Sequence, residues 1–203
     1  MRIIAGKFRS QPLAAPKGWK TRPTSDRLRE TLFNVLAPRI ENAVFADLFA
    51  GTGAVGIEAL SRGARQVYFA ENATAPLEAL RANLKNFRLG SEAQVEPAGT
   101  LSLLRRLRTQ GVLLDIVFLD PPYSDQTAYE STLQHLAEIS TLSADGLVVV
   151  EHARRSPLPK ISECLQPYRT IEQGEAALTF FRRSGVVRKQ VLSPTGKDLV
   201  EPY

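Results

Sequence analysis

Two hydrophobic patterns alternate along the chain. Short runs typical of buried strands occur near residues 44–49, 66–71, 93–96, 115–119, 146–151, 169–173 and 177–182. Between them, apolar residues recur every three or four positions, which predicts helices near residues 55–62, 74–86, 100–110, 127–138 and 157–166. Seven strands separated by helices predict a doubly wound α/β fold with a mostly parallel sheet. Because only a short turn at Gly174 joins the last two strands, we expect the final strand to be antiparallel to its neighbour.

A glycine-rich turn follows the first predicted strand and leads into a helix. Gly51, Gly53 and Gly56 match the G-x-G-x-x-G pattern, in which glycines allow a tight turn and close approach of a ligand to the backbone. Alone, this match is weak, because these glycines can simply shape a strand-to-helix turn. A nicotinamide-dependent oxidoreductase is therefore one alternative for this chain.

Two acidic residues near this turn favour S-adenosylmethionine as the cofactor. Asp47, four residues before Gly51, can attract the cationic methionine part of that cofactor directly or through water, whereas it would repel a pyrophosphate. Glu71 ends the next strand and can accept both ribose hydroxyls, which suits either ligand. The alternatives are that Asp47 caps a helix or turn and that Glu71 is a solvated charge.

The segment Asp120-Pro121-Pro122-Tyr123 directly follows a strongly apolar strand. An exocyclic amine on a nucleobase needs acceptors for its N–H groups, and the Asp120 carboxylate and the Pro121 carbonyl can supply them. Two prolines stiffen the loop and offer no competing N–H. Tyr123 can stack on a base taken out of its helix. The alternative is an ordinary proline-stiffened turn after a buried strand.

Asp47, Glu71 and Asp120 all stand at the carboxyl ends of predicted strands, where parallel sheets bind ligands. We therefore expect one crevice that holds both the cofactor and the base. The predicted catalytic residues are Asp120, Pro121, Pro122 and Tyr123. The predicted cofactor-binding residues are Asp47, Phe49, Gly51, Thr52, Gly53, Glu71, Asn72 and Thr100.

The basic residues are concentrated at the start of the chain. Residues 1–29 hold eight Lys and Arg and one acid, whereas the chain as a whole has a net charge of +5. Such a segment, with Phe8 and Trp19 among its charges, suits contact with a phosphate backbone, although a solvated arm is the alternative. We predict RNA contacts from Arg2, Lys7, Arg22, Pro23, Thr24 and Arg27.

We divide the chain into three parts. Residues 1–38 form a small basic extension whose helix, over residues 27–36, packs on the core; residues 39–183 form the catalytic domain; and residues 184–203 form a tail. The single cysteine, Cys164, excludes an internal disulfide and is expected to be a buried or half-buried apolar residue. His135 and His152 stand apart, so we expect no metal, and we expect His152 to be structural.

These segments together resemble the RsmD-type 16S rRNA (guanine-N2)-methyltransferases. The similarity covers about nine tenths of the chain and rests on Met1-Arg2-Ile3-Ile4-Ala5-Gly6, on residues 22–34, on Asp47-Leu48-Phe49-Ala50-Gly51-Thr52-Gly53, on Asp120-Pro121-Pro122-Tyr123 and on residues 173–179. The Arg-Pro-Thr segment at Arg22 is more specific than the glycine turn, which related methyltransferases share. The resemblance implies the Rossmann-like fold of S-adenosylmethionine-dependent methyltransferases.

The resemblance also implies methyl transfer to the 2-amino group of one guanine in 16S rRNA, within assembling 30S particles. By position, Asp120, Pro121 and Tyr123 would hold the base, and Gly51, Gly53 and Glu71 the cofactor. Such enzymes usually carry an acid after the third strand for the adenine amine, and Gly99-Thr100 stands there instead. Adenine recognition would then rest on backbone groups or on Thr100.

Composition adds limits on the class of protein. The absence of an apolar run of about eighteen residues argues against a membrane span, and the first residues do not resemble a secretory signal. We expect a cytoplasmic monomer. Two alternatives stay open besides the oxidoreductase: a DNA or RNA adenine-N6 methyltransferase, which uses a similar Asp-Pro-Pro-Tyr loop, and a catalytically idle RNA-binding assembly factor.

Overall fold

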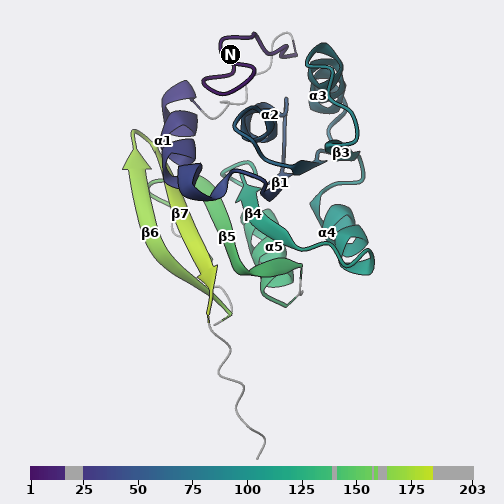
Figure 1. Ribbon diagram of the computed structural model, residues 1–203. Helices are drawn as coiled ribbons and strands as arrows, with labels where there is room; N and C mark the ends of the chain where they lie inside the picture. The colour runs from purple at the N-terminus through teal and green to yellow at the C-terminus, as the bar shows by residue number, and fades with distance from the viewer. Residues whose placement is uncertain (17–24, 139–140, 157, 160–163, 185–203) are drawn as a thin grey trace, which may run out of the picture.

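The computed structural model describes residues 1–16, 25–138, 141–156, 158–159 and 164–184 (Figure 1). Its strands are β1 Val44–Leu48, β2 Gln66–Ala70, β3 Ala93–Glu96, β4 Leu114–Leu119, β5 Leu142–Ala153, β6 Leu165–Gln173 and β7 Ala176–Arg183. Its helices are α1 Asp26–Leu36, α2 Ala54–Ser61, α3 Thr74–Asn86, α4 Thr100–Thr109 and α5 Gln126–Glu138, with a short 3-10 turn, η1, over Ala37–Arg39.

The strands form one seven-stranded sheet in the order β3-β2-β1-β4-β5-β7-β6. Strands β1 to β5 pair in parallel, and β7 is antiparallel to both β5 and β6. The order reverses between β1 and β4, where open α/β sheets place their ligands. The predicted doubly wound sheet and its antiparallel last strand are therefore confirmed.

Helices cover both faces of the sheet, with α1, α2 and α3 on one face and α4 and α5 on the other (Figure 1). The two-residue period of the strands produces this arrangement, because successive side chains point to opposite faces. In β1, Phe45 belongs to the core of the first face and Ala46 to that of the second. The same alternation places Val149 and Val150 of β5 in different cores.

The basic N-terminal segment packs on α2. The buried carboxylate of Glu58 accepts hydrogen bonds from the backbone N–H of Ile4 (2.7 Å) and of Ala5 (2.9 Å). Ser61 accepts another from the N–H of Phe8 at 2.9 Å. Ile3 and α1 join the same core as β1, which agrees with an extension that packs on the core. The proposed boundaries at residues 38 and 183 stay a prediction.

Three details differ from the sequence-based expectations. The helix predicted over residues 157–166 is wrong in its described residues: Leu165 and Gln166 belong to β6, and the others are not helical, while residues 157 and 160–163 lie outside the described part. Pairing of Leu165 with Arg183 of β7 overrides local helical spacing. β5 also starts at Leu142, four residues earlier than predicted.

Cys164 is exposed, contrary to the expectation of a buried thiol. It lies in the turn directly before β6, which is an edge strand of the sheet. Apolar neighbours along the chain therefore do not imply that this side chain is buried. His152 matches its expected structural role, since its ring lies buried and its Nε2 lies 2.9 Å from the Thr179 hydroxyl of β7.

Candidate active site

The glycine turn connects the end of β1 to the start of α2. Gly53 has a φ of +81° and stands at the N-cap position of α2, a left-handed conformation that favours glycine. A Cβ at Gly53 would lie 2.4 Å from Cδ1 of Leu80, and one at Gly56 would lie 2.2 Å from the Phe69 ring. Gly53 and Gly56 therefore allow close packing of the turn on α3 and of α2 on β2.

Glu71 follows β2 and contacts the glycine turn directly. Its Oε2 accepts a hydrogen bond from the N–H of Gly51 at 2.9 Å, and its Oε1 accepts one from the N–H of Ala73 at 2.8 Å. Each carboxylate oxygen can accept a further hydrogen bond, because it has more than one lone-pair site. The carboxylate is thus held at the turn and still suits two ribose hydroxyls.

Asp47 lies beneath the turn and is only 2% exposed. Its Oδ2 accepts a hydrogen bond from the N–H of Gly56 at 2.8 Å, so it satisfies a free donor in the first turn of α2. Burial raises the pKa of the Asp47 carboxyl to about 7; the nearby Glu71 charge acts in the same direction, and the Gly56 hydrogen bond opposes it. The structure therefore favours the helix-capping interpretation, and contact with the cofactor stays a prediction.

The other predicted cofactor residues surround the same turn. Phe49 has a φ of +68° and is half-buried against the core of the α4–α5 face. Thr52 is buried, and its carbonyl accepts a hydrogen bond from Nδ2 of Asn83 at 2.9 Å. Asn72 is exposed directly after β2. It lies next to Gly99, since a Cβ added at Gly99 would lie 3.4 Å from Nδ2 of Asn72. Thr100, 8% exposed, is the first residue of α4 beyond Gly99.

The Asp120-Pro121-Pro122-Tyr123 loop begins where β4 ends. Asp120 is partly exposed, and its backbone N–H donates to the carbonyl of Leu48 at the end of β1. Pro121 is buried, Pro122 exposed and Tyr123 half-buried. The loop is thus fixed at its start by the end of β1, and its aromatic residue is half-buried at the carboxyl edge of the sheet.

A second acid and a second tyrosine support this loop. The hydroxyl of Tyr123 donates to Oε1 of Glu151 at 3.1 Å. The hydroxyl of Tyr129, on α5, lies 3.2 Å from the carbonyl of Pro121 and 3.0 Å from that of Glu151. Burial is the main cause that raises the pKa of both tyrosines, and the charges of Asp120 and Glu151 add to it. Both phenols therefore stay protonated and can donate.

The three predicted acids, Asp47, Glu71 and Asp120, lie near the carboxyl ends of their strands, at one edge of the sheet. Leu48 of β1 stands opposite Ala70 of β2 and opposite Leu119 of β4. Glu71 and Asp120, which follow these partners, therefore flank the glycine turn from opposite sides. The glycine turn and the Asp120-Pro121-Pro122-Tyr123 loop, here called the tyrosine loop, thus lie side by side at the carboxyl ends of β2, β1 and β4.

Sequence reasoning missed Glu151, Tyr129 and Asn83. Glu151 could have been found by the rule that selected the other acids, because it lies near the carboxyl end of a parallel strand. Tyr129 and Asn83 carried no such signal, since both occupy helix positions that pattern alone assigns to the core.

The predicted RNA contacts lie apart from one another along the N-terminal region. Arg2 pairs with Pro12 in an isolated bridge, and its carbonyl accepts a hydrogen bond from the buried Arg29. Lys7 is held through its backbone N–H to Ser61, and its ammonium lies 4.7 Å from the Phe8 ring centre. Arg27 is exposed in the first turn of α1. Arg22, Pro23 and Thr24 lie outside the described residues.

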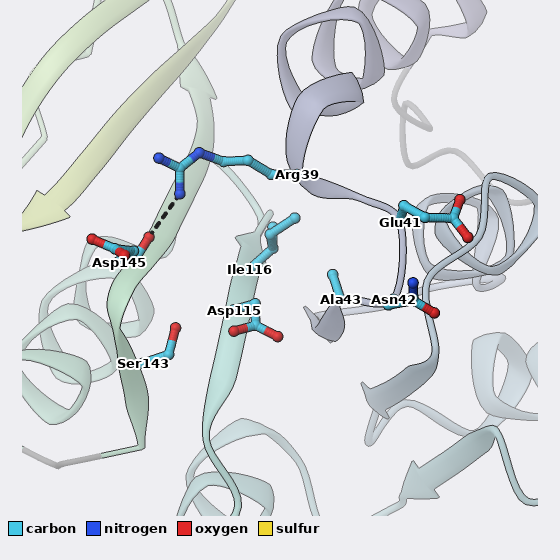
Figure 2. Close-up of a pocket in the computed structure, with 8 residues that line it drawn as sticks. All are labelled: Arg39, Glu41, Asn42, Ala43, Asp115, Ile116, Ser143 and Asp145. Atoms are coloured by element: carbon cyan, nitrogen blue, oxygen red, sulfur yellow. Dashed lines mark hydrogen bonds between the residues drawn. The ribbon is translucent and has the colours of Figure 1, made fainter.

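A cavity of about 220 Å³ opens at the opposite edge of the sheet, by the amino ends of β1 and β4 (Figure 2). It is lined by Arg39, Glu41, Asn42, Ala43, Asp115, Ile116, Ser143 and Asp145. Two of its polar side chains bond to the backbone: Arg39 donates to the carbonyl of Asp145 at 3.0 Å, and Asp115 accepts from the N–H of Val44 at 2.9 Å. We place the candidate site at the carboxyl edge, where this class of sheet binds ligands.

Within the described residues, no three His, Cys, Asp or Glu side chains are grouped so that they could hold a metal ion. None of the helices in that part of the chain has both the length and the apolar character that a membrane crossing requires.

Comparison with known proteins agrees with this geometry. The chain is 36% identical to "Ribosomal RNA small subunit methyltransferase D" of Escherichia coli, over 90% of each chain. It is 33% identical to the "Putative rRNA methyltransferase YlbH" of Bacillus subtilis, over 91% of this chain and all of that one. The solved structure of the "Putative methyltransferase yhhF" of Escherichia coli superposes with a TM-score of 0.77 at 34% identity, covering 90% of this chain and 97% of that chain.

The fold is accordingly that of S-adenosylmethionine-dependent methyltransferases, as the sequence predicts. The family model described as "Conserved hypothetical protein 95" matches residues 1–182. Since the family model spans nearly the whole described chain and the sheet order and relatives agree with it, the chain belongs to the RsmD family of methyltransferases, as the sequence predicts.

Proposed function

We propose that this protein transfers a methyl group from S-adenosylmethionine to the 2-amino group of one guanine in small-subunit ribosomal RNA, in assembling 30S particles. The observation that carries the proposal is the placement of the glycine turn, Glu71 and the Asp120-Pro121-Pro122-Tyr123 loop together at the carboxyl ends of adjacent strands. The similarity to the Escherichia coli protein named ribosomal RNA small subunit methyltransferase D supports the substrate class.

The residues at the turn fit the cofactor. Glu71 presents a carboxylate that is oriented by two backbone N–H groups and keeps acceptor sites for two ribose hydroxyls. Asn72 and Thr100 border the same space at the ends of β2 and β3, where the adenine would lie. When bound, S-adenosylmethionine supplies an electrophilic methyl group, because its sulfur carries a positive charge.

The tyrosine loop orients the target amine. The Asp120 carboxylate and the Pro121 carbonyl accept its two N–H groups, and the Tyr123 ring stacks on the base. Asp120 then takes the proton that the nitrogen loses as it becomes a methylated amine. Catalysis comes mainly from positioning and from exclusion of water, and no covalent bond to the protein is needed.

The basic N-terminal residues would contact the RNA backbone. Arg2, Lys7 and Arg27 lie in the described part of this region, and Arg22, Pro23 and Thr24 lie between them along the chain. Phosphate contacts supply affinity without reading sequence, so the choice of one guanine would depend on the folded RNA and its proteins.

The test is transfer of a labelled methyl group from S-adenosylmethionine to unmodified 30S particles, naked 16S rRNA and duplex DNA, with the product nucleoside identified. N2-methylguanosine in the ribosomal samples supports the proposal, and comparison of the two ribosomal samples shows whether assembly proteins are required. N6-methyladenine in any sample would mean that the target base is adenine and not guanine. Absence of transfer to all three would favour a catalytically idle RNA-binding factor.

A further inference from the structure

Glu151 is an acid of the candidate site that the proposed mechanism does not use. It stands near the carboxyl end of β5 and is 4% exposed. Its neighbour Val150 pairs with Leu119, so Glu151 lies beside Asp120, the first residue of the tyrosine loop. A carboxylate buried at this place needs strong donors, because desolvation of an ionised group is costly.

Two phenols connect the end of β5 to the tyrosine loop. One is Tyr123, whose hydroxyl donates to Oε1 of Glu151 at 3.1 Å. The other is Tyr129, whose hydroxyl lies between the carbonyls of Pro121 and Glu151. The loop is thus linked to β5 at its second residue and at its last.

We propose that Glu151 is a positioning residue for methyl transfer: by holding the Tyr123 hydroxyl, it fixes the plane of the ring on which the target base stacks. This inference rests on the proposed function. Without a partner, a half-buried aromatic ring can turn about its side-chain torsions. A hydrogen bond at the far end of the ring restricts that motion, and bonds to an ionised acceptor are the stronger class.

The contact places two demands on its partners. Tyr123 must stay protonated to donate, which agrees with the raised pKa of this phenol. The partner must also offer an acceptor at the Oε1 position, which an amide can supply but an alanine cannot. Glu151→Gln therefore keeps the contact, whereas Glu151→Ala removes it.

The consequence is a rate effect with little change in binding. RNA affinity comes largely from phosphate contacts, and the glycine turn is held by Glu71 through the Gly51 N–H, with Asp47 bonded to the Gly56 N–H of α2. We expect Glu151→Ala to lower kcat by about tenfold to hundredfold, the range for loss of one hydrogen bond to a charged group. KM for RNA and Kd for the cofactor should stay within about twofold of the wild type, because the phosphate and turn contacts are kept.

The test is a double-mutant cycle with Glu151→Ala, Tyr123→Phe and the double variant, in methyl transfer to 30S particles. If Glu151 acts through the Tyr123 hydroxyl, each single change lowers kcat by a similar factor and the double change lowers it no further. Glu151→Gln should retain kcat within a few-fold of the wild type. Glu172→Ala and Tyr168→Phe, at exposed positions of β6, control for the substitution types.

A second readout does not depend on the substrate. In protein with ring-labelled tyrosine, the Tyr123 signal is identified by its loss in Tyr123→Phe, and its line shape reports ring motion. Glu151→Ala should broaden or shift this signal, whereas Glu151→Gln should leave it close to the wild type. If the wild type transfers no methyl group to any sample, the proposed function fails, and this measurement still decides whether Glu151 holds the ring.

Several results would overturn the inference. One is a wild-type kcat in Tyr123→Phe, which would show that the hydroxyl contact has no role in the rate. Another is that Glu151→Ala lowers kcat by the same factor in the Tyr123→Phe protein as in the wild type, which would mean that Glu151 acts independently of Tyr123. An unchanged ring signal in a folded Glu151→Ala protein would also refute it.

Discussion

The buried carboxyl of Asp47 makes the stability of this protein depend on pH in an unusual direction. Burial raises its pKa to about 7, whereas the ordinary pKa of an aspartate side chain, as in an unfolded chain, is 3.8. The folded protein therefore binds a proton at this site more strongly than the unfolded chain does. The stabilisation is complete below about pH 4 and is lost as the pH rises through 7.

The magnitude follows from the two pKa values. The two pKa values differ by about three units, each worth about 1.4 kcal/mol. The free energy of unfolding therefore falls by at most about 4 kcal/mol between pH 4 and pH 8. This is a large fraction of the about 5–15 kcal/mol that stabilises a typical domain. Asp47→Asn removes the ionisation while an amide oxygen can still accept the Gly56 N–H.

The assay is urea unfolding of the wild type and Asp47→Asn between pH 4.5 and pH 8.5, followed by circular dichroism. We expect the difference in the free energy of unfolding between the two proteins to shift in favour of Asp47→Asn as the pH rises, by about 2–4 kcal/mol in total. Asp115→Asn controls for the substitution itself, because the Asp115 carboxylate also accepts a backbone N–H, that of Val44 in β1. Parallel pH curves for the wild type and Asp47→Asn would refute the reasoning.

The same titration tests the predicted contact of Asp47 with the cofactor. A cationic ligand close to Asp47 would lower its pKa, so binding near pH 6.5 would release a proton to the buffer. Calorimetry in buffers of different ionisation enthalpy measures this release. If cofactor binding releases no proton in the wild type, and Asp47→Asn binds the cofactor with the same proton balance, Asp47 serves the fold alone.

Three further predictions concern the site and its support. Asp120→Ala should abolish methyl transfer while the cofactor Kd stays within a few-fold, measured by calorimetry; loss of cofactor binding would contradict the assignment of Asp120 to the base. Glu71→Ala should weaken cofactor binding by about tenfold to hundredfold, because it loses the ribose acceptors and frees the Gly51 N–H; an unchanged Kd would exclude Glu71 from the cofactor site. Gly53→Ala should lower Tm by several degrees, since its φ is +81° and its Cβ would lie 2.4 Å from Leu80, and an unchanged Tm in thermal unfolding would contradict this packing.

Much of the architecture could be predicted from the sequence. The alternation of apolar runs with helical periods gave the strands and most helices, because each pattern has a local period that burial imposes on it. The glycine turn was also visible, since left-handed conformations and close packing restrict Gly53 and Gly56 to glycine. Placement of Asp47, Glu71 and Asp120 at one edge followed from the parallel topology alone.

What only the tertiary structure decided is which group meets which partner. Asp47 could contact the cofactor or cap a helix on sequence grounds, and the fold shows that it accepts the N–H of Gly56 in α2, nine residues further along the chain. Glu151 became part of the site because β5 pairs with β4, and residues 165–166 became strand because they pair with β7. Spacing along the chain carries no information about such contacts, since hydrogen bonds between distant segments depend on how strands pair and helices pack.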